Sequence, residues 1–200
     1  MSATADQVKQ LREETGAGVL ECKKALDEAG GDMAKAANIL QERGLAKAEK
    51  RAGRETSAGV LDLYSHGEGR VGVMIEVNCE TDFVARTDEF RGFAHEMALQ
   101  VAASAPQWVA VADVPQDVVE EQGAEIRKQA EAEDKPADVI DRIVEGRLGK
   151  FFQEACLLEQ PYIRDDERSV AEILKEMIAT TGENITIRRF VRWSVGDEQS

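Results

Sequence analysis

The chain of 200 residues carries 25 basic and 39 acidic residues, a formal net charge of −14, and 42% hydrophobic residues. It is long enough to bury a hydrophobic core, and its negative charge argues against a general nucleic-acid binder, whose surface is basic. No apolar run approaches the roughly 18 residues of a membrane span, and the first ten residues lack the features of a secretion signal; we therefore expect a cytoplasmic protein with no membrane partner.

The charge is unevenly distributed along the chain. Residues 1–54 carry ten basic and nine acidic residues, whereas residues 55–200 carry fifteen and thirty, which indicates two modules. The three cysteines lie 57 and 77 residues apart and form no CxxC pair or Cys/His cluster, so neither a zinc site nor a disulfide framework is expected. We expect no metal and no cofactor.

Residues 1–53 have the pattern of three short helices. Thr4 and Gln7 form a capping box at the start of the first helix. A second helix is predicted for about 19–29, and Asp32 begins a third that ends at Gly44. The pattern predicts a small three-helix bundle, followed by a basic helical linker over 45–54.

Beyond residue 54 the hydrophobic period changes from that of a helix to that of a strand. Apolar residues alternate with others over 71–77. Residues 60–64 are the expected hairpin partner, because the glycine-bearing segment 65–69 is typical of a turn. A third alternating stretch covers 185–195, and the three together predict a small antiparallel sheet.

Helical patterns fill the interval between these strands. Apolar residues at helical spacing predict a helix over 87–104 and two more over 115–134 and 137–158. The last two are joined by a short connection, so they are expected to form an antiparallel, coiled-coil-like hairpin over about 115–158. A further helix is predicted after Ser169. The fold class is α+β, with the helical bundle followed by a core over 54–200.

The most unusual segment is 78–86, NCETDFVAR, at the end of a predicted strand. In one interpretation Thr81 or Asp82 caps the following helix and Phe83 packs against it, as happens at many strand–helix junctions. In the other, Phe83 is an exposed aromatic anchor beside an acid, an arrangement found in interface hot spots.

Enzymatic chemistry has weak support in the sequence. A Cys79–His95 dyad would need a thiol with a depressed pKa, but the nearby Glu80 and Asp82 favour the neutral thiol. No phosphate-binding loop of the GxxxxGK[ST] or GxGxxG type is present. We therefore expect no catalytic residues, although a Cys/His hydrolase stays open as an alternative.

Five segments, in this order, resemble the bacterial translation elongation factor Ts family, and they span nearly the whole chain. They are LREETGAGVLECKKAL at 11–26, RVGVMIEVNCETDFVAR at 70–86, KPADVIDRIVEGRLGKFFQE at 135–154, EQPY at 159–162 and GENITIRRF at 182–190. The resemblance implies a ubiquitin-associated-like helical domain over 1–53, an exchange-factor core over 54–200, and guanine-nucleotide exchange on elongation factor Tu as the function.

The same resemblance implies roles for particular residues. Asp82 and Phe83 would enter between two helices of the partner's GTPase domain, disturb the groups around Mg²⁺ and let GDP leave, with Thr81 and Val84 shaping the turn. The N-terminal bundle would contact the same domain. Its candidate contact residues are Leu11, Arg12, Gly16, Gly18, Val19 and Lys23.

Longer members of this family carry a duplicated core subdomain, whereas this chain supplies one sheet. The resemblance therefore implies a homodimer. We expect pairing along the strand 185–195, because Ile187, Val191 and Trp193 would otherwise leave an apolar stripe exposed. A different class of function remains open: an adaptor whose helical bundle binds another protein and whose core only dimerises. In that case Asp82 and Phe83 would be dispensable.

Overall fold

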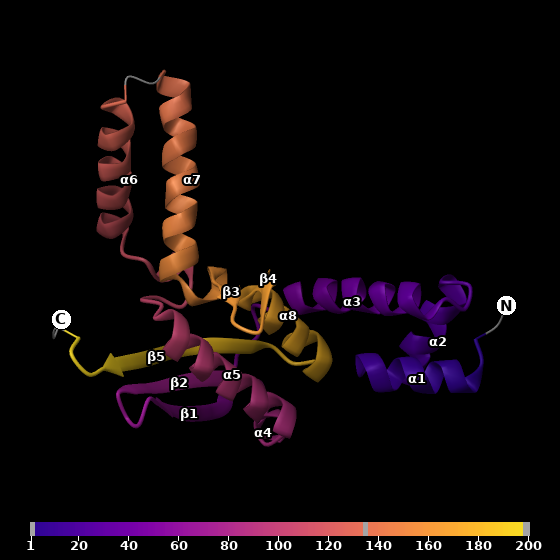
Figure 1. The fold of residues 1–200 in the computed structure, drawn as a ribbon. Helices are drawn as coiled ribbons and strands as arrows, with labels where there is room; N and C mark the ends of the chain where they lie inside the picture. Colours follow the sequence, from indigo (N-terminus) through magenta and orange to yellow (C-terminus); the bar gives the residue numbers. More distant parts are fainter. Residues whose placement is uncertain (1–2, 134–135, 198–200) are drawn as a thin grey trace. The chain divides into compact units, whose positions relative to one another are not determined.

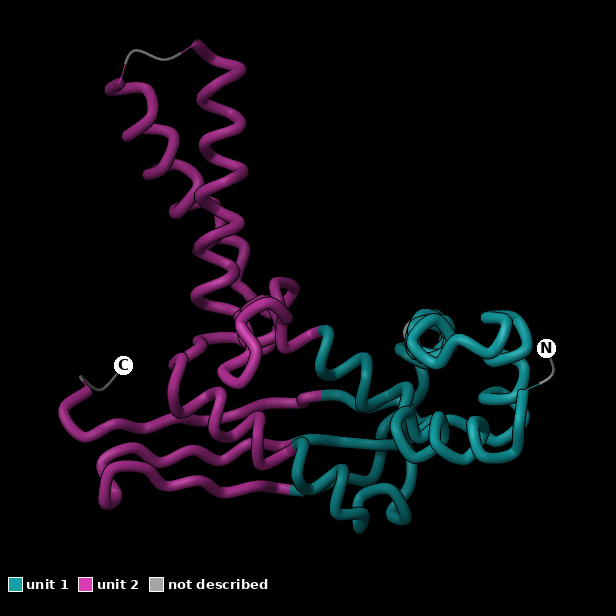
Figure 2. The backbone as a smooth tube through the Cα atoms, turned by 45° about the vertical axis from the view of Figure 1, so that its right-hand side comes forward, with its two compact units in different colours: residues 1–60, 77–93, 172–186 teal, residues 61–76, 94–171, 187–200 magenta. Residues whose placement is uncertain are grey.

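The computed structural model describes residues 3–133 and 136–197 and has an α+β fold (Figure 1). The chain forms two compact units, each assembled from separate stretches of sequence (Figure 2). The first unit comprises 1–60, 77–93 and 172–186, and the second comprises 61–76, 94–171 and 187–200. The boundary expected near residue 53 stays a prediction, since the first unit holds the N-terminal stretch together with two later segments.

The N-terminal bundle consists of α1 (Ala5–Thr15), α2 (Val19–Glu28) and α3 (Met33–Glu49). The predicted capping box is present: the amide of Gln7 donates to Thr4 Oγ1 at 3.3 Å, and the amide of Thr4 donates to Gln7 Oε1 at 3.1 Å. The core of the bundle consists of buried side chains from all three helices. They are Leu11, Cys22, Ala25, Leu26, Ala36 and Leu40.

The third helix is longer than the sequence pattern predicts, and the expectation that it ends at Gly44 is wrong. The helix continues to Glu49. A β-carbon built at Gly44 would lie only 2.9 Å from Cβ of Ala179, in α8 (Val170–Thr181). The glycine therefore permits a close approach of two helices within the first unit, and it does not end one.

The main sheet has three strands in the order β1–β2–β5, with β1 at Ala58–His66, β2 at Val71–Cys79 and β5 at Ile185–Ser194. The alternation predicted for β2 is confirmed, because Val73, Ile75 and Val77 are buried while Met74 is exposed.

A second sheet, of β3 (Pro161–Tyr162) and β4 (Asp165–Ser169) paired antiparallel, was not predicted. Its strands are short, and the segment that forms them has a charged centre, IRDDER at 163–168, which lacks a strand pattern.

Two helices follow β2 directly: α4 (Asp82–Ala85) and α5 (Asp88–Ser104). Within the second unit, α5 covers one face of the sheet. Its His95 lies 3.0 Å from the carboxylate of Asp62 in β1, and the carbonyl of Ala102 accepts from Arg192 Nε in β5 at 3.3 Å. Side chains that alternate with Asp62, Leu61 and Leu63 among them, therefore lie on the opposite face.

The predicted helical hairpin is confirmed as α6 (Gln116–Glu131) and α7 (Ala137–Ala155), which lie side by side in Figures 1 and 2. Polar side chains bridge them: Arg127 donates to Asp141 at 2.7 Å, and Arg147 donates to Gln129 at 3.1 Å. The predicted connection over 133–136 includes residues 134–135, which lie outside the described residues.

Short 3₁₀ helices, η1 (Val111–Asp113) and η2 (Leu157–Glu159), flank the hairpin. In the part of the chain that the structure describes, no helix is both long and apolar enough to cross a membrane.

Candidate functional site

The segment Thr81–Val84 forms a tight, exposed turn between β2 and α5. Thr81 is the N-cap of α4, and its Oγ1 accepts from the amide of Val84 at 3.5 Å. Phe83 is 79% exposed, which contradicts the interpretation that it packs against the helix and agrees with the interpretation of an exposed aromatic anchor. An exposed aromatic side chain beside an acidic one can serve as the anchor of a protein interface.

Asp82 lies beside Phe83 on the same short helix. Its carboxylate accepts from the guanidinium of Arg86 at 2.7 Å, one helical turn further on. Both side chains are more than half exposed, and exposed ion pairs of this kind contribute less than about 1 kcal/mol. Asp82 can therefore exchange Arg86 for donors on a partner at little cost.

Residues distant in sequence hold this turn, and sequence reasoning missed them. The carboxylate of Glu183 accepts from both the amide and the hydroxyl of Thr81, at 3.0 and 2.6 Å. Conversely, Glu80 accepts from the amide of Asn184 at 2.6 Å. Glu183 and Asn184 belong to the matched segment 182–190, but no local pattern linked them to Thr81.

Cys79 lacks the properties of a nucleophile. The thiol is buried and donates to the carbonyl of Thr81 at 3.1 Å. Burial raises its pKa, and the nearby negative charge of Glu183 raises it further, so the thiol is protonated at neutral pH. His95 is paired with Asp62. The thiol is therefore not activated as a Cys/His hydrolase would require, which argues against that alternative.

A second candidate surface lies on the N-terminal bundle. A hollow of about 400 Å³ between α1 and α2 is lined by small apolar side chains and by Lys9, Arg12, Val19 and Lys23. The structure thus brings three of the six predicted contact residues together. Val19 is 52% exposed, and the three basic residues give the hollow a positive rim.

The other three predicted contacts have different roles. Gly16 is exposed and forms the left-handed C-cap of α1, with φ of 68°, and Gly18 is the N-cap of α2. Leu11 is fully buried in the core of the bundle. A direct contact between Leu11 and a partner is incompatible with that burial, so the expectation for this residue is wrong.

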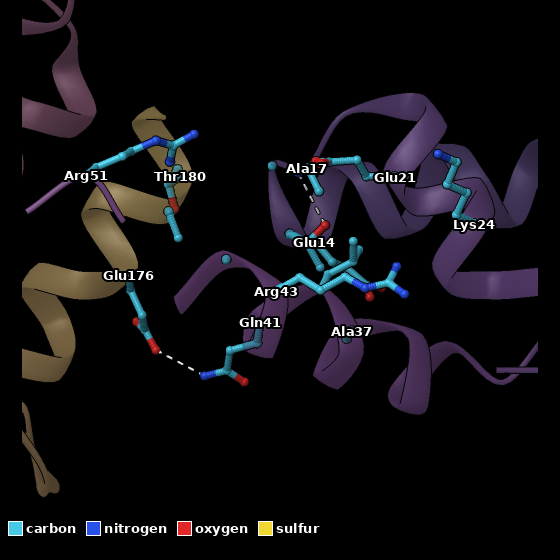
Figure 3. A pocket seen from close by; sticks show the side chains of 15 residues that line it. Glu14, Ala17, Glu21, Lys24, Ala37, Gln41, Arg43, Arg51, Glu176 and Thr180 are labelled. Carbon is cyan, nitrogen blue, oxygen red and sulfur yellow. Dashed lines mark hydrogen bonds between the residues drawn. The ribbon is translucent and has the colours of Figure 1, made fainter. Parts of the chain in front are cut away.

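A larger hollow of about 660 Å³ lies in the first unit (Figure 3). Figure 3 shows Gln41 of α3 bonded to Glu176 of α8, with a distance of 3.2 Å between Nε2 and Oε1. The charged residues around the hollow carry both signs and are exposed or half-buried, so the hollow favours neither an anion nor a cation. They are Glu14, Glu21, Lys24, Arg43, Arg51 and Glu176. Among the residues that the structure describes, no group of three or more His, Cys, Asp or Glu side chains could hold a metal ion.

The sheet face opposite α5 carries large exposed apolar side chains, all in the second unit. Leu61 and Leu63 of β1 are 62% and 71% exposed, and Trp193 of β5 is 73% exposed. Met74 of β2 shares this face with Glu76, which accepts from Arg189 of β5 at 2.7 Å. Trp193 and Val191 alternate with Arg189 and so lie on the same face.

The expected apolar stripe on β5 is only partly present. Trp193 is exposed and Val191 is half-buried, but Ile187 is 7% exposed and belongs to the core of its own chain. Side-chain alternation is interrupted where Arg188 and Arg189 are both exposed. Ile187 therefore points away from the face that carries Trp193, and the expectation that it is left exposed is wrong.

Comparisons with known proteins agree on one family. A family model described as elongation factor TS matches residues 35–197. The elongation factor Ts of Coprothermobacter proteolyticus is 58% identical over 197 residues, which covers 98% of this chain and 100% of the relative. That of Carboxydothermus hydrogenoformans is 55% identical, covering 97% and 89%, and that of Thermotoga neapolitana is 54% identical, covering 99% and 100%. The resemblance found in the five sequence segments is confirmed, and the chain belongs to the elongation factor Ts family.

Proposed function

We propose that the chain is the guanine-nucleotide exchange factor of elongation factor Tu and that Asp82 and Phe83 act as its wedge. The observation that carries the proposal is the 79% exposure of Phe83 on a four-residue helix, in a chain of this family. The proposed site acts by binding and displacement and makes or breaks no covalent bond, so the chain is not an enzyme in that sense. As a translation factor it would act in the cytoplasm.

The wedge supplies two kinds of interaction to the nucleotide-binding domain of the partner. Phe83 offers a large apolar side chain, which stabilises the complex only when the partner covers it. Asp82 offers a carboxylate that backbone amides or a cation of the partner can bind in place of Arg86. Inserted between two helices near the Mg²⁺ site, the pair would disturb the groups that hold GDP.

Thermodynamic linkage restricts how the wedge can work. If the chain weakens GDP binding by some factor, GDP must weaken binding of the chain by the same factor. Asp82 and Phe83 must therefore compete with the nucleotide–Mg²⁺ complex, because a chain that bound only alongside it would not accelerate release. The surface formed by Arg12, Val19 and Lys23 does not need to compete, and we assign it to anchoring on the same domain.

Stopped-flow release of fluorescent GDP from purified elongation factor Tu tests the proposal. The native chain should accelerate release, and the Asp82→Ala/Phe83→Ala double variant should lose the acceleration while it still binds the partner. An Arg12→Ala/Lys23→Ala variant should instead need a higher concentration for half-maximal acceleration. If the native, folded chain does not accelerate release, the exchange function is wrong and the adaptor alternative is favoured.

We further propose that two copies pair through the apolar sheet face of Leu61, Leu63, Met74 and Trp193. Burial of these side chains against a second copy would remove them from water, which favours association by roughly 25 cal/mol for each Å² of apolar surface. Light scattering should give twice the mass of the 22.0 kDa chain, and Leu63→Glu should give the single mass. A native mass near that of one chain at every concentration would refute the dimer.

A further inference from the structure

We propose that Glu183 is a positioning residue for the wedge: it fixes the cap of α4 and thereby holds Phe83 in the orientation that a partner meets. The inference rests on the exchange function proposed above, and it adds a residue that lies 102 positions further along the chain than its contact, Thr81.

Glu183 uses both of its carboxylate oxygens on one residue. Oε2 accepts from the amide of Thr81 at 3.0 Å, and Oε1 accepts from the hydroxyl of Thr81 at 2.6 Å. Because the hydroxyl donates its single hydrogen to Glu183, a lone pair of Oγ1 is directed to the amide of Val84, from which it accepts at 3.5 Å. The carboxylate thus sets the orientation of the cap, and its charge strengthens both bonds.

The contact is one half of a reciprocal arrangement, which we call the clasp, formed by Glu80, Thr81, Glu183 and Asn184. Glu183 accepts from the amide of Thr81, and Glu80 accepts from the amide of Asn184 at 2.6 Å. Asn184 is 2% exposed, and its side chain donates to the carbonyl of Arg54 at 2.7 Å. The clasp is therefore anchored in the buried part of the first unit, although Thr81 itself is exposed.

The Cys79 thiol, which donates to the carbonyl of Thr81, and the buried Ala85 also hold the turn, but its exposed residues contribute little to its order. α4 has four residues, and a single helical turn is unstable on its own. Phe83 is 79% exposed, so packing does not set its position, and the Asp82–Arg86 pair is exposed and weak. A turn that is already ordered avoids the ordering cost on binding. The clasp should therefore affect the step in which the wedge enters the partner more than the first encounter.

Four variants of the full chain separate this role from a general structural one. Glu183→Ala removes both acceptors, and Glu183→Gln keeps one acceptor oxygen and replaces the other by an amide that cannot accept. Thr81→Ser keeps the amide and hydroxyl that the clasp uses. Glu55→Gln is the matched control, because Glu55 is exposed in the same unit and the charge change is identical.

Two measurements are made on each variant. Nuclear magnetic resonance follows amide hydrogen exchange of Thr81 in the free chain, and stopped flow follows GDP release from elongation factor Tu over a range of chain concentrations. Loss of both acceptors in Glu183→Ala should speed exchange of the Thr81 amide about tenfold and lower the maximal release rate about five- to tenfold. The half-saturating concentration should stay within about threefold, because the anchoring surface is intact. Glu183→Gln should be intermediate. Thr81→Ser should keep the slow exchange of the amide at position 81, because serine supplies the same amide and hydroxyl to Glu183. Glu55→Gln should match the native chain in both measurements.

The outcomes distinguish the two proposals. Faster Thr81 exchange together with a lower maximal release rate supports the positioning role. Unchanged Thr81 exchange in Glu183→Ala overturns it, as does faster exchange with an unchanged maximal rate. In a further outcome, the native chain fails to accelerate GDP release from elongation factor Tu while Glu183→Ala still speeds exchange of the Thr81 amide. That result would refute the exchange function and support the clasp as the element that orders the turn.

Discussion

Replacing Gln100 by alanine should destabilise the second unit. Gln100 of α5 is fully buried. Its amide nitrogen lies 3.2 Å from Gln160 Oε1 and 3.1 Å from the carbonyl of Pro161, and its oxygen accepts from the amide of Ile163 at 2.9 Å. This one side chain therefore ties the β3–β4 segment to α5, and no apolar side chain can supply the same bonds.

The magnitude follows from the groups that lose their partner. The amide of Ile163 loses its acceptor, and the carbonyl of Pro161 and the buried Oε1 of Gln160 lose a donor. A buried group costs about 1–3 kcal/mol when it is left without a partner out of water, which applies in full to Gln160 Oε1. The bonds to Pro161 and Ile163 are only partly buried, so their loss costs less. The side chain of glutamine loses about 1–2 kcal/mol of rotamer entropy on burial, and alanine avoids this cost. We expect a net loss of about 2 kcal/mol in the free energy of unfolding, within the usual range for destabilising single substitutions.

Urea unfolding followed by tryptophan fluorescence measures this loss. Both tryptophans, Trp108 and Trp193, belong to the second unit, so the signal reports the unit that carries the change. With a typical urea dependence of about 2 kcal/mol per M, the midpoint should fall by about 1 M. Gln122→Ala is the matched control, because Gln122 is exposed on α6, and its effect should stay within about 0.5 kcal/mol. A loss below about 1 kcal/mol in Gln100→Ala would refute the assigned role of this side chain.

Three further predictions concern packing, pH and thiol chemistry. Gly44→Ala places a methyl group 2.9 Å from Cβ of Ala179 and should cost about 1 kcal/mol in thermal unfolding despite the better helix propensity of alanine; Ala179→Gly in the same chain should restore the loss, and no restoration would contradict the close approach. Hydrogen bonds and charge from Arg164 lower the pKa of Glu96, so this pair stabilises the fold above the ordinary pKa of a glutamate and the stability is lost as pH falls through the lowered value. Urea midpoints of the native chain and Glu96→Gln should therefore differ at pH 7 and converge at acid pH, whereas a constant difference would argue against the ion pair. All three cysteines are buried and free, so a thiol reagent such as Ellman's reagent should react with them only after denaturant is added, and rapid labelling of the native chain would contradict their burial.

Local patterns predicted the regular elements well, because each such pattern acts over a few residues. The capping box of Thr4 and Gln7 and the alternation in β2 are both present in the structure. The end of α3 was misplaced because glycine is ambiguous: at a helix end it relieves backbone strain, but at Gly44 it makes room for Ala179. Which of the two applies depends on a helix more than one hundred residues away.

The candidate site was predicted in part for the same reason. Its exposed residues, Asp82 and Phe83, stand together in the sequence and could be singled out. The residues that hold them could not, because the bond from Thr81 to Glu183 joins positions 102 residues apart. The exposure of Ile187 was predicted wrongly because the prediction requires strict alternation of side chains along the whole of β5. The strand changes this pattern at Arg188 and Arg189.

The two halves of the clasp are far apart in sequence, and this has a consequence during synthesis of the protein. A nascent chain on the ribosome contains Asp82 and Phe83 well before Glu183 and Asn184 have been added. Until those residues emerge, the proposed clasp cannot form, and Phe83 should be less ordered. Under the proposal, unfinished or prematurely released chains would contain every residue of the wedge but present it in a less ordered form. They would then act on elongation factor Tu less effectively than chains whose synthesis has reached the last strand.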